Sequence, residues 1–279
     1  MSRITVRDIA RMKSKGEKIP MITAYDYTSA RLADSSEIPI ILVGDSLGMV
    51  VLGYDSTIPV TMNDMVHHTK MVVRGSNNAH VVADMPFMSY QIDSTQTLTN
   101  AARLIQEGGA NSIKLEGGEN VAETVRRIVD CGIPVMGHIG LTPQSVNAFG
   151  GYRVRGRDCQ EAIQLLKDAQ TIQDAGAYAL VLELVPTQLS GIISKRLKIP
   201  TIGIGAGPEC DGQVQVLHDM LGLFTDFVPK HAKLYAELAS TIQKAFSQYR
   251  DEVRNGVFPT AKQSFEMAPS VLSALTTQQ

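Results

Sequence analysis

Residues 105–116, Ile-Gln-Glu-Gly-Gly-Ala-Asn-Ser-Ile-Lys-Leu-Glu, return in varied form at residues 172–183, Ile-Gln-Asp-Ala-Gly-Ala-Tyr-Ala-Leu-Val-Leu-Glu. Each copy has the pattern of a last helical turn, a glycine stop and a short apolar strand that ends in glutamate. Steps from helix to strand of this kind recur in parallel α/β proteins. The repeat therefore predicts an α/β fold with parallel strands.

The two predicted strands differ on one face. Because successive side chains of a strand point to opposite faces, Lys114 and Glu116 share one face of the first strand, and their apolar neighbours share the other. The corresponding pair in the second strand is Val181 and Glu183. A charged pair on the inner face of an apolar strand is energetically costly unless something uses it. These inner positions are therefore candidate functional positions.

Further strands are indicated by a repeated Ile-Pro dipeptide. Proline as the first residue of a strand loses no ladder hydrogen bond, so the pairs at 19–20, 38–39, 133–134 and 199–200 mark strand entries. The predicted strands are 21–25, 40–44, 80–83, Ser112–Glu116, 135–137, Ala179–Glu183, Thr201–Ile204 and a weak eighth at 224–228.

Amphipathic helical stripes fill the gaps between these strands, at 98–105, 121–129, 162–172, 214–221 and 234–249. Thr5 and Asp8 resemble a capping box, which predicts an opening helix to about Lys15. An open doubly wound sheet is the rival fold, but residues 23–29 lack the glycine-rich phosphate loop that normally follows its first strand. About eight β-then-α units favour a (β/α)8 TIM barrel with an extra N-terminal helix.

The length of 279 residues and the hydrophobic content of 44% suit one barrel domain, for which we expect residues 1–254. Asn255-Gly256 breaks the last helix, and we expect residues 255–279 to form a C-terminal extension that follows the surface and frays at its end.

Composition argues for a small-molecule partner. The net charge is -2 and there is no block of like charges, which gives no reason to expect binding to nucleic acid or a membrane. Cys131, Cys159 and Cys210 lie far apart without metal-ligand spacing, as suits a reducing compartment. The N-terminus has no apolar signal segment, and no apolar run is long enough to span a bilayer. We expect a cytoplasmic protein.

Ionisable or polar side chains follow the predicted strands two to six. Barrel active sites lie at the C-terminal ends of the strands, so these side chains should meet at one rim. They are Asp45 with Ser46, Asp84, Lys114 with Glu116, His138, and Glu183.

Each of these residues also has a structural interpretation when it is taken alone. Asp45 or Ser46 could cap a turn, Asp84 could brace the turn before Met-Pro, Lys114 and Glu116 could pair with each other, and His138 could be a hydrogen-bonded core residue. Glu183 has few partners in the sequence around it. The series from five consecutive strands favours function for all of them.

The residue types indicate a reaction. Asp45, Asp84 and Glu116, without cysteine or paired histidine, describe a hard oxygen-ligand site that suits Mg²⁺. An anionic substrate with two oxygens, such as a 2-oxo acid, would chelate the metal, and Lys114 would balance the charge. The metal would then act as a Lewis acid that stabilises an enolate. A carboxylate kept off the metal in apolar surroundings suits a general base, and Glu183 fits that role.

Two loops keep open alternatives. Ile202-Gly-Ile-Gly-Ala-Gly207 is either a phosphate loop or a set of glycines that allows close packing at the rim. Residues 141–157, which include Arg153, Arg155 and Arg157, form either a lid or second-substrate loop or a solvated basic loop.

The motifs in series closely resemble those of the ketopantoate hydroxymethyltransferase family, from about Arg3 to Arg254. The matching segments are Val43-Gly-Asp-Ser46, Asp84-Met-Pro-Phe87, Lys114-Leu-Glu-Gly-Gly118, His138-Ile-Gly-Leu-Thr-Pro-Gln144, Gly150-Gly-Tyr152, Glu183 before Val185-Pro186, Ile202-Gly-Ile-Gly-Ala-Gly207 and Asp211-Gly-Gln213. One departure is His231, where the family tends to carry an aromatic residue; we expect it to affect packing and not chemistry.

The resemblance implies a (β/α)8 barrel of the phosphoenolpyruvate mutase/isocitrate lyase superfamily and a homo-oligomer of decameric type. It implies transfer of a hydroxymethyl group from 5,10-methylenetetrahydrofolate to 3-methyl-2-oxobutanoate through a Mg²⁺-stabilised enolate, in pantothenate biosynthesis. By position, Asp45 and Asp84 resemble metal ligands that also contact the substrate, and Glu116 the third metal-associated carboxylate. Ser46 and Lys114 resemble substrate-binding residues, Glu183 the base, and His138 a group beside the enolate oxygen.

Three other functions are considered. A lyase or mutase of the same superfamily would carry a reactive cysteine at the rim, and the three cysteines fall in or beside predicted helices. A non-catalytic barrel that binds a 2-oxo acid or folate would not need the full set of ionisable residues. A Schiff-base aldolase that uses Lys114 is disfavoured because Glu116 would keep that lysine charged.

Overall fold

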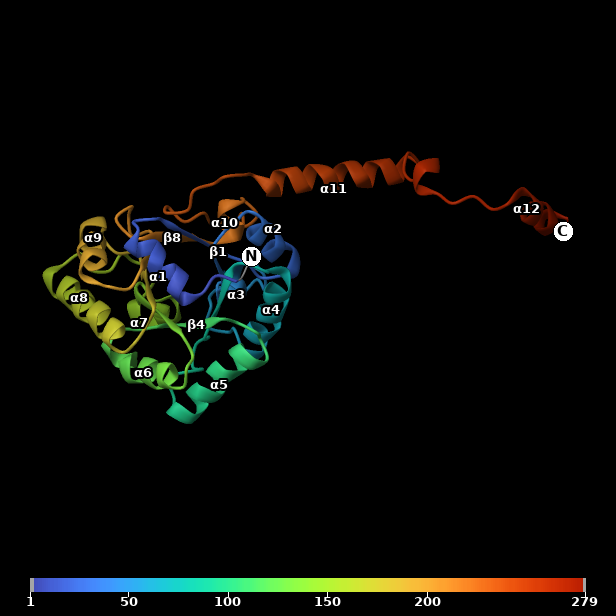
Figure 1. Cartoon of the computed structure of the whole chain (residues 1–279). Coiled ribbons are helices and arrows are strands. Elements are labelled where there is room, and N and C mark those ends of the chain that lie inside the picture. The colour runs from blue at the N-terminus through green and yellow to red at the C-terminus, as the bar shows by residue number, and fades with distance from the viewer. Residues whose placement is uncertain (1–2, 278–279) are drawn as a thin grey trace.

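A computed structural model describes residues 3–277. Eight parallel strands close into a barrel in which each strand pairs with its neighbours in chain order, and β8 returns to β1 (Figure 1). The strands are β1 Ile19–Thr23, β2 Ile40–Val43, β3 His80–Asp84, β4 Ser112–Glu116, β5 Val135–Gly140, β6 Ala179–Glu183, β7 Thr201–Ile204 and β8 Gly212–Gln215. The predicted (β/α)8 TIM barrel is therefore confirmed.

Helices surround the barrel. They are α1 Val6–Ser14, α2 Tyr27–Ser35, α3 Leu47–Val50, α4 Met62–Gly75, α5 Ser94–Gln106, α6 Ala122–Asp130, α7 Val146–Phe149, α8 Cys159–Asp174, α9 Thr187–Arg196, α10 Leu217–Met220, α11 Leu238–Arg254 and α12 Pro269–Thr276, with the 3-10 turns η1 Glu119–Val121, η2 Pro143–Ser145 and η3 Ala261–Gln263. Capping follows the sequence signals: Thr5 and Asp8 form the expected capping box of α1, and Asp158 caps α8.

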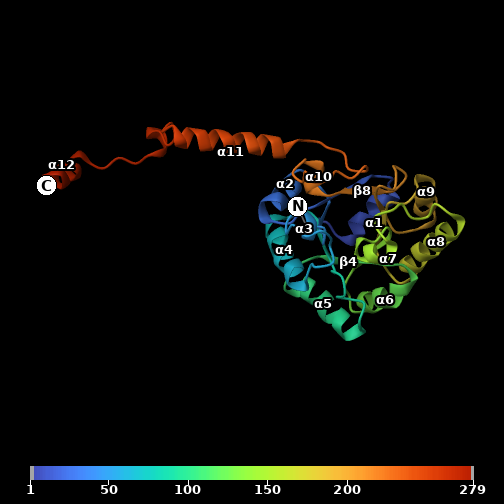
Figure 2. The same ribbon diagram turned by 180° about the vertical axis from the view of Figure 1, so that it is seen from behind.

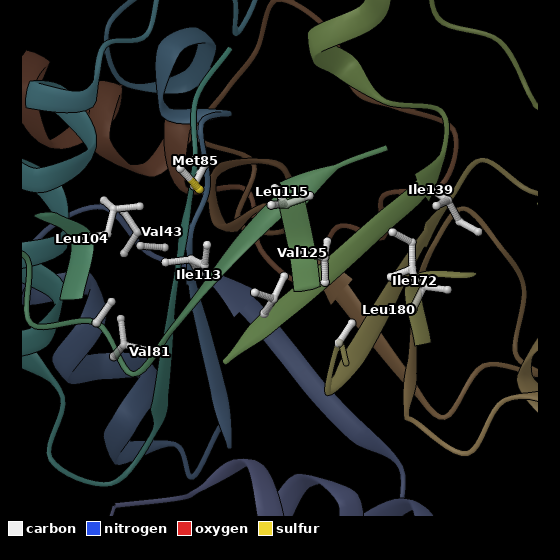
Figure 3. Close-up of a cluster of buried hydrophobic side chains, with 14 of the residues drawn as sticks. Val43, Val81, Met85, Leu104, Ile113, Leu115, Val125, Ile139, Ile172 and Leu180 are labelled. Carbon is white, nitrogen blue, oxygen red and sulfur yellow. The ribbon is translucent and has the colours of Figure 1, made fainter. Parts of the chain in front are cut away.

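The main core lies between the strands and the outer helices. Outward-facing strand residues, such as Ile113 of β4 and Leu180 of β6, lie there in one cluster with Val125 of α6 and Ile172 of α8, and all four are fully buried (Figure 3). This contact explains the alternation in the repeated sequence, because the outward positions of β4 and β6 must be apolar.

A second, smaller core fills the inside of the barrel. It contains Met21, Val82, Met136 and Val181, and Ile9 of α1 closes it from the N-terminal end of the strands. The predicted N-terminal helix therefore acts as a plug. β4 adds no apolar side chain to this layer, since its inward positions carry polar or charged groups. The functional residues lie above this layer.

The eighth strand is not where the sequence pattern placed it. We expected it at 224–228, but β8 is Gly212–Gln215, a segment we had assigned to a helix after Asp211. The Asp211 carboxylate does not cap a helix. It accepts hydrogen bonds from the Thr201 N–H at 2.8 Å and from Lys13 Nζ at 2.8 Å, and so joins β7 to the plug helix.

The C-terminal part leaves the barrel. Helix α11 has no buried residue, and together with α12 it extends away from the barrel in both opposite views (Figures 1 and 2). The expectation that the chain after Asn255 follows the surface is therefore wrong: Phe265 is fully exposed, and no barrel contact covers it. The frayed end expected at Gln278 and Gln279 lies outside the described residues.

Within residues 3–277, no helix is long and apolar enough to cross a membrane.

Candidate active site

The strand ends bring the predicted residues together. On β3 to β6, every second side chain faces the barrel interior. Asp84, Glu116, His138 and Glu183 occupy such positions at the C-terminal ends of these strands, beyond the inner apolar layer. Asp45 follows β2 and donates its backbone N–H to Asp84 Oδ2 at 3.1 Å. Five strands therefore build one cluster of ionisable side chains at the C-terminal mouth.

Lys114 pairs with Asp84 and not with its sequence neighbour Glu116. The Nζ to Oδ1 distance is 2.9 Å, and both side chains are buried. Burial acts to lower the pKa of Lys114, but Asp84, Glu116 and Asp45 raise it above its ordinary value. The lysine is therefore a permanent cation, which disfavours a Schiff-base mechanism on the amine.

The pKa of Asp45 depends on its burial and on the charged groups around it. Burial, and then the neighbouring charges of Asp84 and Glu116, raise its pKa well above the ordinary value. The pKa of Asp84 is also raised by burial, although Lys114 opposes this. The mouth therefore holds more negative charge than Lys114 alone compensates.

His138 joins the two glutamates of the sequence repeat. Its Nδ1 lies 3.5 Å from Glu116 Oε1, and its Nε2 lies 3.3 Å from Glu183 Oε2. Burial and Lys114, whose Nζ lies 3.3 Å from Nδ1, act to lower the pKa of His138, but the two glutamates raise it to about 9. Glu183 therefore has a buried partner that the sequence around it did not indicate.

Ser46 is held by a residue that the sequence analysis missed. Its Oγ lies 2.9 Å from the hydroxyl of Tyr25, and it makes no side-chain cap to α3, so the capping alternative does not apply. Tyr25 follows β1 and is buried, and His68 Nδ1 lies 2.6 Å from its backbone oxygen. Only its position after strand one could have indicated a site role.

Gln144 and Tyr90 were also missed. Both are buried loop residues that hydrogen-bond to the cluster, Gln144 to Asp45 at 2.8 Å and Tyr90 to the Glu116 backbone N–H at 3.1 Å. Gln144 lay inside a quoted family motif, but nothing in its spacing pointed to the carboxylates.

The residues present fit a hard divalent cation. Ionised Asp45, Asp84, Glu116 and Glu183 would face the cations Lys114 and His138, which leaves two uncompensated negative charges. Asp84 Oδ1 is buried and has no hydrogen bond of good geometry, although Lys114 lies near it. Among the described residues, no group of three His, Cys, Asp or Glu side chains is already arranged to hold a metal ion. The excess negative charge and the free Asp84 Oδ1 fit Mg²⁺, which binds through few carboxylates and keeps water and substrate ligands.

The loop at 141–157 reaches over this cluster. The Tyr152 hydroxyl lies 3.9 Å from Met49 Sδ of α3, and burial, followed by the charges of Glu183 and Asp45, raises its pKa. Arg155 is not a solvated base: it stacks on Phe149 at 4.2 Å and pairs with Glu161 at 3.0 Å. Of the three arginines only Arg155 is packed in this way, whereas Arg153 and Arg157 are exposed, as the solvated-loop interpretation expects.

The glycines after β7 serve close packing. A Cβ at Gly205 would lie 2.6 Å from Leu184, and one at Gly207 would lie 2.4 Å from Thr187, at positive φ in both cases. His231 packs on Gly205, as expected from the sequence, and burial lowers its pKa although the charge of Glu183 opposes this.

The cysteines lie away from the cluster. Cys131 caps the end of α6 and Cys159 begins α8, both exposed, while Cys210 is buried just before β8. The reactive rim cysteine that a superfamily lyase would require is therefore not found among the described residues.

Comparisons with known proteins identify the family of this chain. The family model described as ketopantoate hydroxymethyltransferase matches residues 3–261. The chain belongs to the ketopantoate hydroxymethyltransferase family. A protein of Dehalococcoides mccartyi strain CBDB1, named 3-methyl-2-oxobutanoate hydroxymethyltransferase, is 59% identical over 273 residues, which cover 98% of either chain. One of the same name from Carboxydothermus hydrogenoformans is 57% identical and covers 99% of this chain and 100% of its own. By this family membership the chain is a transferase.

Solved structures share the ketopantoate hydroxymethyltransferase fold at low identity. Phosphonopyruvate hydrolase, solved with oxalate and Mg²⁺, has a TM-score of 0.61 at 11% identity and covers 98% of this chain and 96% of its own. A 2,3-dimethylmalate lyase, described as a PEP mutase/isocitrate lyase superfamily member, has a TM-score of 0.59 at 16% identity and covers 100% and 96%. This likeness shows that the chain shares its fold with these enzymes.

Proposed function

We propose that this chain transfers a hydroxymethyl group from 5,10-methylenetetrahydrofolate to 3-methyl-2-oxobutanoate, giving 2-dehydropantoate in pantothenate biosynthesis. The observation that carries the proposal is the single buried cluster in which Asp45, Asp84 and Glu116 share the mouth with an ion-paired lysine and a fourth, separate carboxylate, Glu183. The substrate is the one in the names of relatives at 57–59% identity over nearly the whole chain.

Asp45 and Asp84 would hold Mg²⁺, and Glu116 would serve as the third carboxylate around it. When bound, Mg²⁺ supplies Lewis-acid polarisation of the substrate's 2-oxo group, which favours the enolate. The chain's own contribution is charge and orientation. Lys114 lies beside Asp84 and would attract the substrate carboxylate, while Ser46, fixed by Tyr25, would donate a hydrogen bond to it.

Glu183 would take the proton from C3 of 3-methyl-2-oxobutanoate. Its side chain is 15% exposed, and His138 Nε2 lies 3.3 Å from its Oε2 without a hydrogen bond of good geometry. By the family resemblance, His138 would lie beside the oxygen that gains charge as the proton leaves. The C3 carbon then bonds to the methylene carbon as one of the two C–N bonds of that carbon breaks. Water replaces the second C–N bond and so supplies the hydroxyl group. The C3 proton and one water proton end on the two folate nitrogens, which releases tetrahydrofolate.

Proton exchange at C3 tests this proposal without the folate. The purified protein in D₂O should exchange the C3 proton of 3-methyl-2-oxobutanoate in a Mg²⁺-dependent manner, followed by NMR, and should form 2-dehydropantoate once 5,10-methylenetetrahydrofolate is added. Exchange without product on adding the folate would contradict the proposed donor. If the protein shows no exchange and forms no product, a binding protein would be favoured instead. Asp45→Asn should weaken Mg²⁺ binding at least about tenfold in a calorimetric titration; unchanged affinity would exclude Asp45 as a ligand.

We further propose a homo-oligomer, of the decameric type that the family resemblance suggests, in which α11 packs on a second copy. Phe246, Tyr249 and Val253 form an apolar stripe on α11 that is exposed in the single chain, and β8 is followed within the barrel only by the four-residue α10. On this proposal residues 1–254 form the catalytic domain, completed by the partner copy, and 255–279 are an extension. Phe246→Asp should lower the mass measured by light scattering; an unchanged mass would reject this interface.

The cytoplasmic location expected from the cysteine pattern belongs to the same proposal. Fractionation of cells that express the protein would test it, and recovery in a membrane or secreted fraction would contradict it.

A further inference from the structure

Gln144 has an unusual number of partners for a loop residue. It lies on the 3-10 turn η2, is almost fully buried, and follows β5 by four residues. Its side-chain Nε2 donates to Asp45 Oδ2 at 2.8 Å and to the Met85 carbonyl at 2.9 Å, and its backbone N–H donates to Glu116 Oε2 at 3.0 Å. One residue thus contacts carboxylates that come from two strands, β2 and β4.

The orientation of the Gln144 amide is fixed by its neighbours. The Met85 carbonyl only accepts, so the amide nitrogen must face it, and the same nitrogen then faces Asp45. The amide oxygen lies 2.8 Å from the hydroxyl of Tyr90, whose single proton it shares with the Glu116 carbonyl at 3.0 Å. The hydroxyl oxygen of Tyr90 in turn accepts the Glu116 backbone N–H at 3.1 Å. A continuous set of hydrogen bonds therefore links Glu116, Tyr90, Gln144 and Asp45.

These hydrogen bonds hold one oxygen of the Asp45 carboxylate and one of the Glu116 carboxylate and leave the other oxygen of each free. Gln144 ties Oδ2 of Asp45 and Oε2 of Glu116. Among the described residues, Oδ1 of Asp45 and Oε1 of Glu116 accept no hydrogen bond, although Glu116 Oε1 lies 3.5 Å from His138 Nδ1. A carboxylate with one oxygen held by a donor keeps one direction for its free oxygen, which favours binding of a cation by reducing the entropy lost.

We propose that Gln144, held by Tyr90, is a positioning residue that orients Asp45 and Glu116 so that one oxygen of each is presented to a divalent cation at the mouth. This inference rests on the proposed function, in which that cation is Mg²⁺. Gln144 touches neither the substrate nor the metal. Its effect should therefore appear in metal affinity and not in the rate at saturating metal.

Direct Mg²⁺ titration of the full-length protein by calorimetry tests the inference. Gln144→Leu keeps the approximate volume and removes the side-chain donor, and should weaken Mg²⁺ binding roughly 10- to 100-fold. The half-saturating Mg²⁺ concentration for C3 proton exchange should rise by the same factor, while the exchange rate at saturating Mg²⁺ stays within about threefold of wild type. Tyr90→Phe removes only the hydroxyl that orients the amide and should give a smaller shift in the same direction.

A matched control is Gln170→Leu on α8, whose side chain bonds only to the exposed Asp174, and which should bind Mg²⁺ as wild type does. If Gln144→Leu does not fold, as judged by its thermal melt, Tyr90→Phe carries the test. If the folded variants bind Mg²⁺ with the affinity of the wild type, the role of Gln144 is overturned and the proposed function still stands. Wild-type protein that binds no Mg²⁺ would overturn both.

Discussion

The ends of β4 and β6 begin from nearly the same sequence and reach different chemistry. Glu116 is buried, held by the Gln144 backbone N–H, and follows Lys114 on the inner face of its strand. Glu183 is more exposed, contacts His138 Nε2 at 3.3 Å, and follows the apolar Val181. The comparison shows that a repeated helix-to-strand step fixes where a carboxylate lies, whereas its neighbours on adjacent strands fix what it can do.

Removing the cation beside Glu116 should have the largest effect. Lys114→Met would leave Asp84, Asp45 and Glu116 buried without their positive partner, which costs roughly 3–5 kcal/mol of folding free energy when one partner of a buried pair is lost. Urea unfolding in Mg²⁺-free buffer should show this loss, and C3 exchange should disappear. Val181→Met on β6, the matched change at the equivalent position, should cost less; equal losses would mean that Lys114 holds no special electrostatic role.

The bridge between the two glutamates gives the next largest effect. His138 has a pKa of about 9 in the folded chain against an ordinary 6.5, so its contribution to stability is present below pH 6.5 and is lost as the pH rises through 9. This difference corresponds to about 3 kcal/mol. Wild-type stability without metal should fall between pH 6.5 and 9, and His138→Asn should flatten that fall and slow exchange roughly 10- to 100-fold.

A control for this bridge lies at the other end of the barrel. His80 begins β3, bonds Ser112 at 2.9 Å, and has its pKa lowered to about 4 by burial. His80→Gln should leave the exchange rate at saturating substrate unchanged. The same alkaline fall in stability in wild type and His138→Asn would contradict the assignment to His138.

The smallest effect should come from the loop at 141–157. The Tyr152 hydroxyl lies 3.9 Å from Met49 Sδ, and burial, followed by the charge of Glu183, raises its pKa. Tyr152→Phe should raise KM for the 2-oxo acid a few-fold, with kcat and thermal stability nearly unchanged. Steady-state kinetics measure this. A large fall in kcat with constant KM would place Tyr152 in the chemistry instead.

Much of the fold was predictable because strands four and six can be recognised in the sequence as apolar runs that follow a glycine. β8 was not, since Gly212–Gln215 contains a single apolar residue, Val214, and the backbone needs a glycine where a Cβ would meet the Ile19 carbonyl at 2.3 Å. The periodic apolar residues after Asp211 imitated a helix. α11 was recognised as a helix, but its departure from the barrel could not be predicted, because its apolar stripe looks the same whichever surface it packs on.

The cluster was predictable where strand periodicity sets it. Asp84, Glu116, His138 and Glu183 follow from parity along neighbouring strands, and the structure places them together with Asp45 and Lys114. Their pairing was not predictable. Lys114 pairs with Asp84 and not with Glu116 because Asp84 and Lys114 lie opposite each other in the register of β3 and β4. Tyr25, Tyr90 and Gln144 come from loops, whose paths no sequence period encodes.

The central claim, that Glu183 and Glu116 have separate roles, is tested most directly by C3 deuterium exchange measured beside Mg²⁺ titration in Glu183→Gln and Glu116→Gln. We predict that Glu183→Gln loses exchange by roughly 10²- to 10⁴-fold and binds Mg²⁺ nearly as wild type does. Glu116→Gln should weaken Mg²⁺ binding and recover much of its exchange at high Mg²⁺. Undiminished exchange in Glu183→Gln would contradict the account.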